Sequence, residues 1–399
     1  MPTNKLKIFK FNKMKKLILS VIAIASIAFT SCETDDIVIV GGGTDESLNL
    51  AGNVLENRTL TAGNAYVLNG PMFIKSGATL TIEPGTTITA QAGGTDVYLL
   101  VERGGRIVAD GTANAPIRFT SSSRTPAAWG GVIINGNAFI SGQNPQGQNE
   151  AGTEVNTGIL FGGDNDTEDS GILDYVIIEY TGARIDGDAE HNGLTLNGVG
   201  SGTTLSNIWI ANGDDDAIEF FGGSVNASNI FVLNAKDDMF DVTQGYRGTL
   251  TNLYGVREAG YVAVTSDPRG IEADGNLDGN SPSDNTQSVF TVNNLTIATY
   301  GNSVDFSDLI KVRRGATATI NNALAGTFGT ATASDFIDFY DDKGTSSDAS
   351  VVNATANGTA DGTDNKFSGT NGSTTATANV TTTNTGTDSS LFAWTGYMF

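Results

Sequence analysis

The sequence predicts an all-β solenoid of the parallel β-helix type, and three observations predict it. A short strand motif recurs about every 22 residues in the middle of the chain, no window sustains a helical period over three turns, and 50 of the 399 residues are glycine. A repeat of this length holds two short strands and their turns. Each repeat therefore forms one rung, which pairs with rungs about 4.8 Å above and below it.

The first 31 residues predict a signal peptide rather than a part of the fold. Lysines are frequent in residues 5–16, and an apolar stretch of about 14 residues, 17–30, is too short to span a bilayer. The only cysteine, Cys32, stands at the expected cleavage point, so we expect lipoprotein processing with acylation of Cys32. An ordinary signal peptide with an incidental cysteine is the alternative, and Met14 offers a second start that still leaves a complete signal.

Residues 32–48 are rich in glycine and acidic side chains and predict a short tether. The whole chain has 22 basic and 44 acidic residues, which excludes a nucleic-acid-binding protein that works by neutralising phosphates. One cysteine excludes a disulfide scaffold, and one histidine argues against a triad centred on histidine.

Residues 49–345 are predicted to form the β-helix. In its first half, short apolar pieces at 80–85, 100–109, 117–120 and 131–134 are joined by turns that contain glycine. Residues 141–172 lack a core pattern, so they are expected to leave the rod as a long loop.

The second half carries the clearest repeat. The motif at 216–220, Asp-Ala-Ile-Glu-Phe, returns at 238–242, 308–312 and 335–339, with weaker copies at 193–196 and 270–273. Its apolar positions are predicted to point inward as continuous columns: Ile218, Phe220, Phe240, Val242, Ile310, Val312, Ile337 and Phe339. A second column is expected to stack asparagines that bond one another in the turns: Asn207, Asn229, Asn252, Asn294 and Asn322.

Residues 346–399 are predicted to end the solenoid. Up to residue 390 the segment is dominated by small polar residues, which form either thin final rungs or a partly disordered stretch. The apolar segment 391–399 is expected to fold over the exposed rod end as a cap, with a docking role as the alternative.

Several motifs resemble a known family. The stretches SGATLTIEPGTTI, WGGVIINGNA, DDAIEFFGGSVNASNI and RGIEADGNLDGN resemble right-handed parallel β-helix proteins of the pectin-lyase-like class over roughly residues 50–345. More narrowly, the chain resembles surface lipoproteins of the Bacteroidetes type, whose role is uncharacterised. This resemblance implies the fold but not an activity, because the fold hosts lyases, hydrolases, adhesins and passive rods. The acids after Cys32 resemble a surface-export signal, which implies an outer-membrane lipoprotein that faces the medium.

One position of the repeat predicts a chemically active column. The residue between the two inward side chains is usually charged, and its copies are Thr195, Glu219, Asp241, Glu272, Lys311 and Asp338. Carboxylates about 5 Å apart in register repel one another unless a cation or a proton intervenes, which predicts bound calcium or raised pKa values. Further acids lie at the rung edge: Asp214, Asp215, Asp216, Asp237 and Asp238. A solvated acidic face is the alternative.

The candidate catalytic residues come from this column and its edge. They are Asp215, Asp216, Asp238, Asp241 and Lys311. The resemblance implies two chemistries, a calcium-dependent lyase with a basic residue and a hydrolase with paired aspartates. The chain departs from both, because no Gly-His-Gly follows the aspartates and the lone His191 lies upstream, where a turn or surface histidine is expected. Lys311 and Arg313 are alternatively ion partners of Asp308 or Asp338.

A separate calcium loop is predicted at Asp274, Asn276 and Asp278, which match the first half of a D-x-N-x-D-G motif. Position twelve is Asn285 rather than glutamate, so the expected affinity is weak, about 0.1 to 1 mM. A plain Asp/Asn turn is the alternative.

Ligand binding is assigned to four side chains, Glu219, Asp241, Trp209 and Tyr246, because sugars stack on exposed rings and bond to carboxylates. Packing between neighbouring rungs is the alternative role for the two rings.

Together these features predict a monomeric, lipid-anchored protein of the outer-membrane surface that binds extracellular glycans or acts as an adhesion module, with calcium as the expected cofactor. Its expected partners are the lipid anchor and a polysaccharide or other extracellular ligand. Two alternatives remain, a calcium-dependent polysaccharide lyase or hydrolase on the acidic lateral face and a passive structural spacer.

Overall fold

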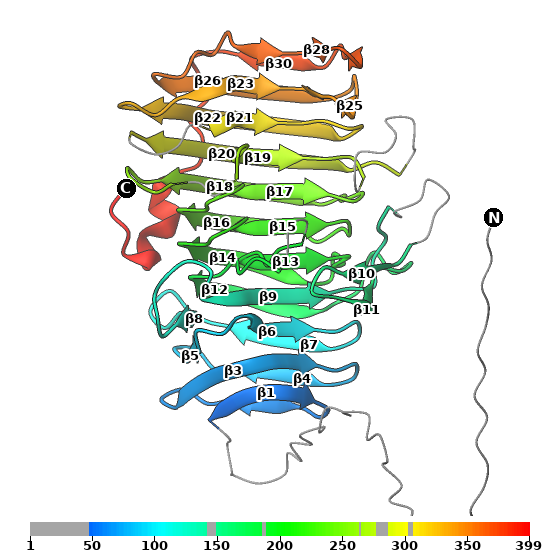
Figure 1. Ribbon diagram of the computed structural model, residues 1–399, viewed down its shortest axis with the longest axis vertical. Helices are drawn as coiled ribbons and strands as arrows, with labels where there is room; N and C mark the ends of the chain where they lie inside the picture. The colour runs from blue at the N-terminus through cyan, green and yellow to red at the C-terminus, as the bar shows by residue number, and fades with distance from the viewer. Residues whose placement is uncertain (1–47, 142–148, 186–188, 263–264, 277–285, 302–305) are drawn as a thin grey trace, which may run out of the picture. The chain divides into compact units, whose positions relative to one another are not determined.

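The structure is a computed structural model that describes residues 48–141, 149–185, 189–262, 265–276, 286–301 and 306–399. Its main sheet has 24 strands, which pair in parallel with the rungs before and after them. Figure 1 shows the rungs stacked from β1 to β30. The all-β parallel solenoid predicted from the repeat is confirmed. Within the described ranges, no helix is both long and apolar enough to cross a membrane.

Each rung contributes strand segments to three faces. Face 1 contains the second halves of β1 (Asn49–Val54) and β3 (Ala65–Ile74), then β6 (Gly94–Val101), β9 (Trp129–Asn135), β13 (Leu194–Asn197), β15 (Ile218–Phe221), β17 (Phe240–Thr243), β19 (Arg269–Ala273), β21 (Phe306–Lys311), β23 (Ala333–Asp338) and β27 (Asn365–Lys366). Face 2 begins with β2 (Arg58–Leu60), β4 (Thr79–Ile82) and β7 (Arg106–Asp110). Face 3 begins with the first halves of β1 and β3, then β5 (Thr87–Ala90) and β8 (Ile117–Ser121).

From the fourth face-2 strand onward, single long strands serve both faces 2 and 3. They are β12 (Gly171–Glu179), β14 (Thr204–Ala211), β16 (Ala227–Leu233), β18 (Thr249–Arg257), β20 (Val289–Tyr300), β22 (Thr317–Phe328) and β26 (Val351–Gly358), and β30 (Thr377–Val380) closes face 2. Each of them must bend where face 2 passes into face 3.

In β14, β16, β18, β20 and β22 the bend is made by the predicted asparagine column, and in β12 Tyr175, with a φ of 47°, takes the equivalent position. Asn207, Asn229, Asn252, Asn294 and Asn322 all have positive φ angles between 50° and 63°, a conformation that asparagine tolerates better than most residues. From Asn229 onward, each side-chain amide donates to the amide oxygen of the asparagine one rung earlier, at 2.8–3.0 Å, while the amide of Asn207 donates to Asp174 Oδ1 at 2.8 Å. The predicted ladder is therefore confirmed, and each ladder member both shapes its own turn and bonds the turns beside it.

The interior is filled by the predicted apolar columns. All eight side chains expected to point inward are at most 1 % exposed, among them Ile218, Phe240 and Phe339. The period-two alternation of the strands places them inside because successive side chains point to opposite faces of a sheet. The core is consequently continuous through the described rungs, from Leu50 to Ala376.

Of the loop predicted at 141–172, the described residues 149–170 lie outside the coil and are partly ordered, whereas residues 171–172 already belong to β12. β10 (Ala151–Thr153) and β11 (Asn156–Phe161) form an antiparallel hairpin. Val155 and Ile159 of this hairpin pack against Tyr98, Leu100 and Ile133, which point outward from face 1. The hairpin therefore covers the apolar beginning of face 1.

The segment 346–390 forms final rungs, with β26, β27 and β30 in the main sheet. Two small antiparallel hairpins lie beside them, one made of β24 (Tyr340–Asp341) and β25 (Gly344–Thr345) and the other of β28 (Ser368–Gly369) and β29 (Gly372–Ser373). Of the two alternatives for this segment, the structure shows the thin final rungs.

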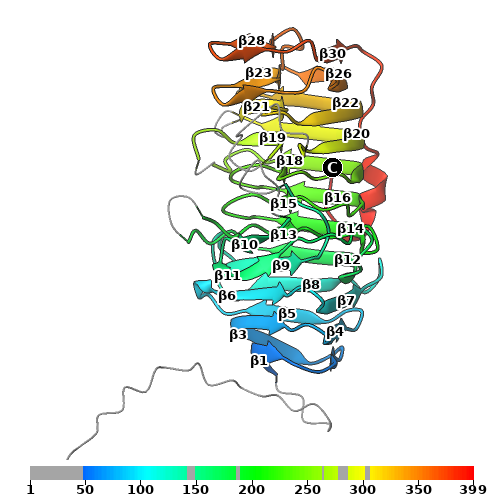
Figure 2. The same ribbon diagram turned by 90° about the vertical axis from the view of Figure 1, so that its right-hand side faces the viewer.

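The predicted cap over the rod end is wrong. Residues 385–399, here called the C-terminal strap, run back along the flank, and their 3-10 helix η2 (Ser389–Thr395) lies beside β14, β16 and β18 (Figures 1 and 2). Phe392 of the strap is fully buried against an aromatic cluster that includes Phe231 and Tyr254. An aromatic patch on the flank buries more apolar surface than the polar last rung offers, which explains the position of the strap.

The predicted signal peptide, Cys32 and residues 32–47 of the tether lie outside the described residues.

Candidate acidic site on face 1

A concave acidic site lies on face 1, where β15, β17 and β19 carry the charged column. It is a pocket of about 260 Å³, here called the acidic pocket. Its lining is almost entirely charged: Glu154, Glu190, Asn192, Asp215, Asp216, Glu219, Asp237, Asp238, Asp241, Asp267, Arg269, Glu272 and Arg313. The pocket therefore gathers carboxyl groups from three successive rungs and from the loops around them.

The register of the strands brings the column together as the repeat predicted. Thr195 pairs with Glu219, Glu219 with Asp241, and Asp241 with Glu272. The alternative of a solvated acidic face does not hold for Glu219 and Glu272, which are only 9 % and 5 % exposed, whereas Asp241 is half-buried. These carboxyls lie in a partly enclosed site, where charge is harder to solvate.

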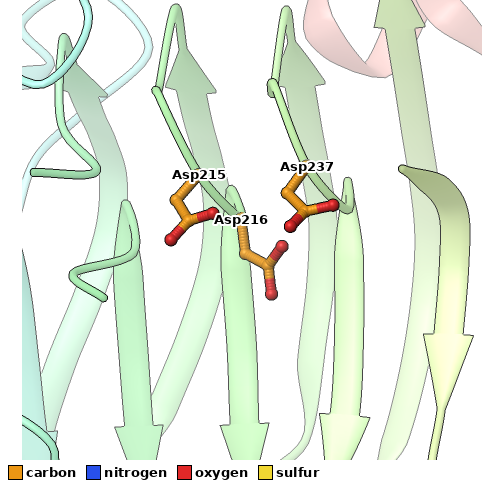
Figure 3. A group of neighbouring side chains, drawn as sticks. All are labelled: Asp215, Asp216 and Asp237. Atoms are coloured by element: carbon orange, nitrogen blue, oxygen red, sulfur yellow. The ribbon is translucent and has the colours of Figure 1, made fainter. Parts of the chain in front are cut away.

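The rung-edge acids lie in the turns that lead from face 3 into face 1. Figure 3 shows Asp215 and Asp216 in the turn before β15, with Asp237 in the equivalent turn one rung later. One carboxylate oxygen of each lies within 4.8 Å of those of the other two. A second group of the same kind consists of Asp216, Asp238 and Asp241. The backbone N–H of Asp238 donates to Asp216 Oδ1 at 2.8 Å, which fixes the two turns relative to each other.

Burial and mutual repulsion raise the pKa values of these groups. Burial raises the pKa of Asp237 to about 7, with the charge of Asp238 adding to the effect. The pKa of Asp238 rises only to about 6, since Arg269 offsets its burial. The pKa values of Asp216 and Asp241 lie well above the ordinary range, first because of burial and then because of Asp238. At neutral pH, protonated and ionised carboxyls therefore lie side by side.

Asp215 occupies the rim of this group. Burial raises its pKa to about 9, although Arg184 Nη2 lies 2.8 Å from its Oδ1 and opposes the shift. Burial also raises the pKa of Glu219, with Asp241 as the next cause, while Asn192 Nδ2 donates to its Oε2 at 2.5 Å and opposes the shift. These carboxyls therefore lose their protons at a higher pH than exposed carboxyls do.

The donor set fits a divalent cation. Calcium takes six to eight oxygen ligands, commonly carboxylates, and several carboxylate oxygens here converge within 4.8 Å. Asp241 Oδ1 is buried and has no hydrogen-bond partner, so one potential ligand atom in the group is unsatisfied. The residues that would hold such an ion are Asp216, Asp238 and Asp241, with Asp215 and Asp237 beside them.

Two arginines close the far end of the pocket. Arg269 bonds Glu272 and, at 3.0 Å, Asp267, while its backbone N–H donates to Asp238 Oδ1 at 2.5 Å. Arg313 bonds Glu272 and, through Nε at 2.6 Å, Asp274. Both guanidinium groups are therefore held in ion pairs at the edge of the acidic cluster.

Lys311, the fifth catalytic candidate, does not line the pocket. Its Nζ lies 2.5 Å from Asp338 and 3.4 Å from Asp308. The alternative expectation for Lys311, an ion partner of Asp308 or Asp338, is confirmed. Arg313 instead pairs with the neighbouring set of acids described above.

The predicted calcium loop is only partly described. Asp274 is buried, and its two carboxylate oxygens bond Arg313 and, at 2.7 Å, Arg314. Asn276 is also buried, and Asp278 lies outside the described residues. A cation at Asp274 would have to compete with two guanidinium groups for the same oxygens.

The two aromatic candidates do not belong to the pocket. Tyr246 is fully buried and its hydroxyl donates to the carbonyl of Val225 at 2.6 Å, so its assignment to ligand binding is wrong. Trp209 lies on β14, which belongs to faces 2 and 3, and stacks on Phe231 at a ring-centroid distance of 5.9 Å. Trp209 therefore does not lie on face 1 with Glu219 and Asp241, and its assignment to a ligand site with them is also wrong. Both rings take the packing role.

His191 was expected in a turn or on the surface, but it is 1 % exposed. Burial lowers its pKa to about 4, so its ring is neutral at physiological pH.

The structure adds lining residues that the sequence analysis did not single out: Glu154, Glu190, Asn192, Asp267 and Arg269. Glu272 of the charged column, Asp237 of the rung edge and Arg313 also line the pocket, although they were not among the candidate catalytic or ligand-binding residues. Glu154 and Glu190 come from loops without a repeat, so no period in the sequence leads to them.

Comparisons with known proteins place this geometry in a family. No curated protein matches the chain. Among solved structures, the chain is similar to the full-length tailspike protein 2 (TSP2, ORF211) from Escherichia coli O157:H7 bacteriophage CAB120, with 10 % identity and a TM-score of 0.28. The match covers 78 % of this chain and 42 % of the tailspike chain, so the chain spans less than half of that structure.

The family model described as "Pectate-lyase like beta helix domain" matches residues 52–398, nearly all of the described solenoid. The chain therefore belongs to the pectate-lyase-like β-helix family.

Proposed function

We propose that this protein binds extracellular glycans in the acidic pocket, and that it does so on the cell surface as an outer-membrane lipoprotein anchored through Cys32. The observation that carries the proposal is the concave pocket of about 260 Å³ in which carboxyls of three rungs converge. Carboxylates accept hydrogen bonds from sugar hydroxyls, and protonated carboxyls donate them. A pocket that holds both forms side by side suits a ligand that is rich in hydroxyl groups.

Calcium is part of the proposal. The ion would be held by Asp216, Asp238 and Asp241, whose carboxylate oxygens lie within 4.8 Å of one another. It would neutralise the repulsion that adds to the effect of burial on their pKa values, and its remaining coordination positions suit sugar hydroxyls or a sugar carboxylate. Binding would then depend on calcium.

The test is retention of the chain without residues 1–32 on immobilised acidic and neutral polysaccharides, with calcium or with a chelator. The double variant Asp216→Asn with Asp241→Asn should lose retention while its circular dichroism spectrum is unchanged. The matched control is Asp110→Asn with Asp361→Asn, which changes the charge equally at two exposed positions. Equal retention of the wild type and the pocket variant would contradict the proposal.

Glycoside hydrolysis in the same pocket is a second candidate, favoured by one observation. Asp216 and Asp241 have strongly raised pKa values, whereas the pKa of their neighbour Asp238 rises only to about 6. A protonated and an ionised carboxyl are the pair that a glycosidase needs as general acid and as base or nucleophile. Release of reducing ends by the wild type, and its loss in Asp238→Asn, would support hydrolysis. Retention without any product would support a protein that binds glycans but does not cleave them. The absence of both retention and product would favour a passive spacer.

A further inference from the structure

A second pocket lies on face 1, next to the acidic pocket. It has a volume of about 380 Å³ and is here called the aromatic pocket. It is lined by Pro71, Thr95, Asp96, Tyr98, Val155, Ile185 and His191. Its size falls within the range of small-ligand sites, and apolar walls with a few convergent polar groups are typical of such sites.

The two pockets share a wall built from consecutive residues. On the β10–β11 hairpin, Glu154 lines the acidic pocket and Val155 lines the aromatic pocket. In the loop before β13, Glu190 and Asn192 line the acidic pocket, whereas His191 between them lines the aromatic pocket. Neighbouring side chains point to opposite sides at both places, so the pockets lie back to back across one thin partition.

The residues that point outward from face 1 explain why one pocket is apolar and the neighbouring pocket acidic. Leu100 pairs with Ile133, Ile133 with Thr195, and Thr195 with Glu219. The column is therefore apolar on β6 and β9 and acidic on β15, β17 and β19. At about 4.8 Å per strand, the change from β6 to β15 takes about 14 Å along the axis.

The polar groups of the aromatic pocket are fixed. His191 Nε2 lies 3.3 Å from the carbonyl oxygen of Thr95, and the imidazole packs against the Tyr98 ring at a centroid distance of 5.1 Å. Phe73 supports Tyr98 from the other side at 5.8 Å, edge to face. The rings on this wall are thus held in place before any ligand arrives, which lowers the entropic cost of binding.

We propose that the aromatic pocket is a second subsite for the glycan chain that enters the acidic pocket. The ligand is then an oligosaccharide of at least two units that lies along the rod axis. One unit contacts the carboxyls through its hydroxyls, and the other places an apolar sugar face or an acyl or methyl substituent against Tyr98, Val155 and Ile185. This inference rests on the proposed function, because the acidic pocket defines where the chain enters.

The test is the dependence of affinity on chain length. Calorimetry would use oligogalacturonides as the acidic probe and xylo-oligosaccharides as the neutral probe, each from one to six sugar units, with calcium present. For the probe that binds, affinity should rise at least tenfold between the monosaccharide and the trisaccharide. Val155→Trp, which fills the aromatic pocket, should abolish this gain.

Two controls keep the result interpretable. Val289→Trp adds the same ring at an exposed position on another face and should behave as wild type. Val155→Ser removes the apolar contact without adding bulk and should also reduce the gain, which answers the objection that tryptophan displaces the hairpin.

The outcomes separate the two proposals. A wild type that binds the monosaccharide as tightly as longer chains, or a Val155→Trp variant that keeps the gain, overturns the second subsite alone. Binding that survives in Asp216→Asn with Asp241→Asn but falls in Val155→Trp contradicts the acidic pocket as the entry site. If no probe of either series binds at any length, both proposals are overturned.

Discussion

Glu219 and Asp241 lie directly opposite each other on the neighbouring parallel strands β15 and β17, and both line the acidic pocket. Opposed positions in such a pair are about 4.8 Å apart, a distance at which two ionised carboxyls repel each other strongly in a partly desolvated site. Protons or a cation must therefore compensate the repulsion, and the first predictions follow from this.

Replacing one of the two carboxyls by a neutral amide should stabilise the metal-free protein. In Asp241→Asn the amide keeps the shape of the side chain and removes a buried carboxyl that must otherwise either carry a proton or repel Asp238 and Glu219. We expect a gain of about 1 kcal/mol, or roughly 2 °C in the melting temperature of a domain of this size. Thermal unfolding in a chelator measures it. A melting temperature below that of the wild type would show that the carboxylate stabilises the fold.

The stability of the metal-free protein should fall as the pH rises. Asp238, Asp237 and Asp215 have folded-state pKa values of about 6, 7 and 9. Unfolded aspartate titrates at about 3.9, so between about pH 4 and pH 9 the folded state binds more protons than the unfolded state, and the free energy of unfolding decreases.

Denaturant titrations at about pH 5 and pH 8 test this prediction, since stability should be greater at the lower pH. Saturating calcium should reduce the difference, because the ion replaces the protons. A metal-free protein that is more stable at the higher pH would contradict the assigned shifts.

Any increase in melting temperature that calcium produces should depend on the residues of the acidic pocket rather than on the predicted loop at Asp274. Asp274→Asn leaves Arg313 and Arg314 without their shared carboxylate, so it should destabilise the protein by roughly 2–4 kcal/mol with or without calcium. Asp216→Asn should instead remove most of the increase in melting temperature that calcium produces. Loss of the calcium response in Asp274→Asn alone would place the ion in the loop.

The asparagine ladder should be a large contributor to stability. Asn229 donates to Asn207 at 3.0 Å and accepts from Asn252 at 2.8 Å, and its φ is +56°. Asn229→Ala loses two hydrogen bonds of about 1 kcal/mol each and adds about 1–2 kcal/mol of backbone strain.

Asn229→Gly separates the two effects, since glycine tolerates the positive φ and should lose only the hydrogen bonds. Thr204→Gly, at an exposed strand position one rung earlier, serves as the control for chain flexibility. Equal destabilisation by alanine and glycine at position 229 would show that the strain is negligible.

The C-terminal strap should detach when its buried ring is removed. Phe392→Ala leaves a cavity against Phe231 and Tyr254 and costs about 3–5 kcal/mol of binding free energy between the strap and the flank. The contacts of the other, more exposed residues of η2 are too weak to replace this loss. Trp394, which packs edge to face on Tyr175 at 5.3 Å, should then show red-shifted fluorescence. Leu391→Ala, at a partly exposed neighbour, should leave the emission unchanged.

The sequence predicts the rungs well because each rung repeats one local pattern. The burial of Ile218 and Phe240 and the place of Asn229 in the ladder follow from the alternation of side chains and from the 22-residue period. Every rung pairs with the next in the same way, so no further contact has to be predicted. The convergence of Glu219 and Asp241 was predictable for the same reason, since identical positions of adjacent rungs must lie side by side.

What the sequence did not predict comes from parts that cross the rungs. Trp209 is covered by the C-terminal strap, which lies far from it in the sequence and does not follow the 22-residue repeat. Glu154 enters the acidic pocket from a hairpin whose docking depends on an apolar patch around Leu100 and Ile133. Such contacts depend on three-dimensional complementarity and leave no period in the sequence.

The route of the strap changes how the end of the molecule can open. An array in which each repeat touches only its neighbours loses structure from its tip, one repeat at a time. Here the backbone N–H of Thr385 donates to Asn322 at 2.7 Å, and Thr387 Oγ1 donates to the carbonyl of Leu253 at 2.7 Å, so the chain after the last strand is fastened several rungs below it. Opening of β30 therefore creates a closed loop rather than a free end, and the restricted freedom of that loop favours its reclosure.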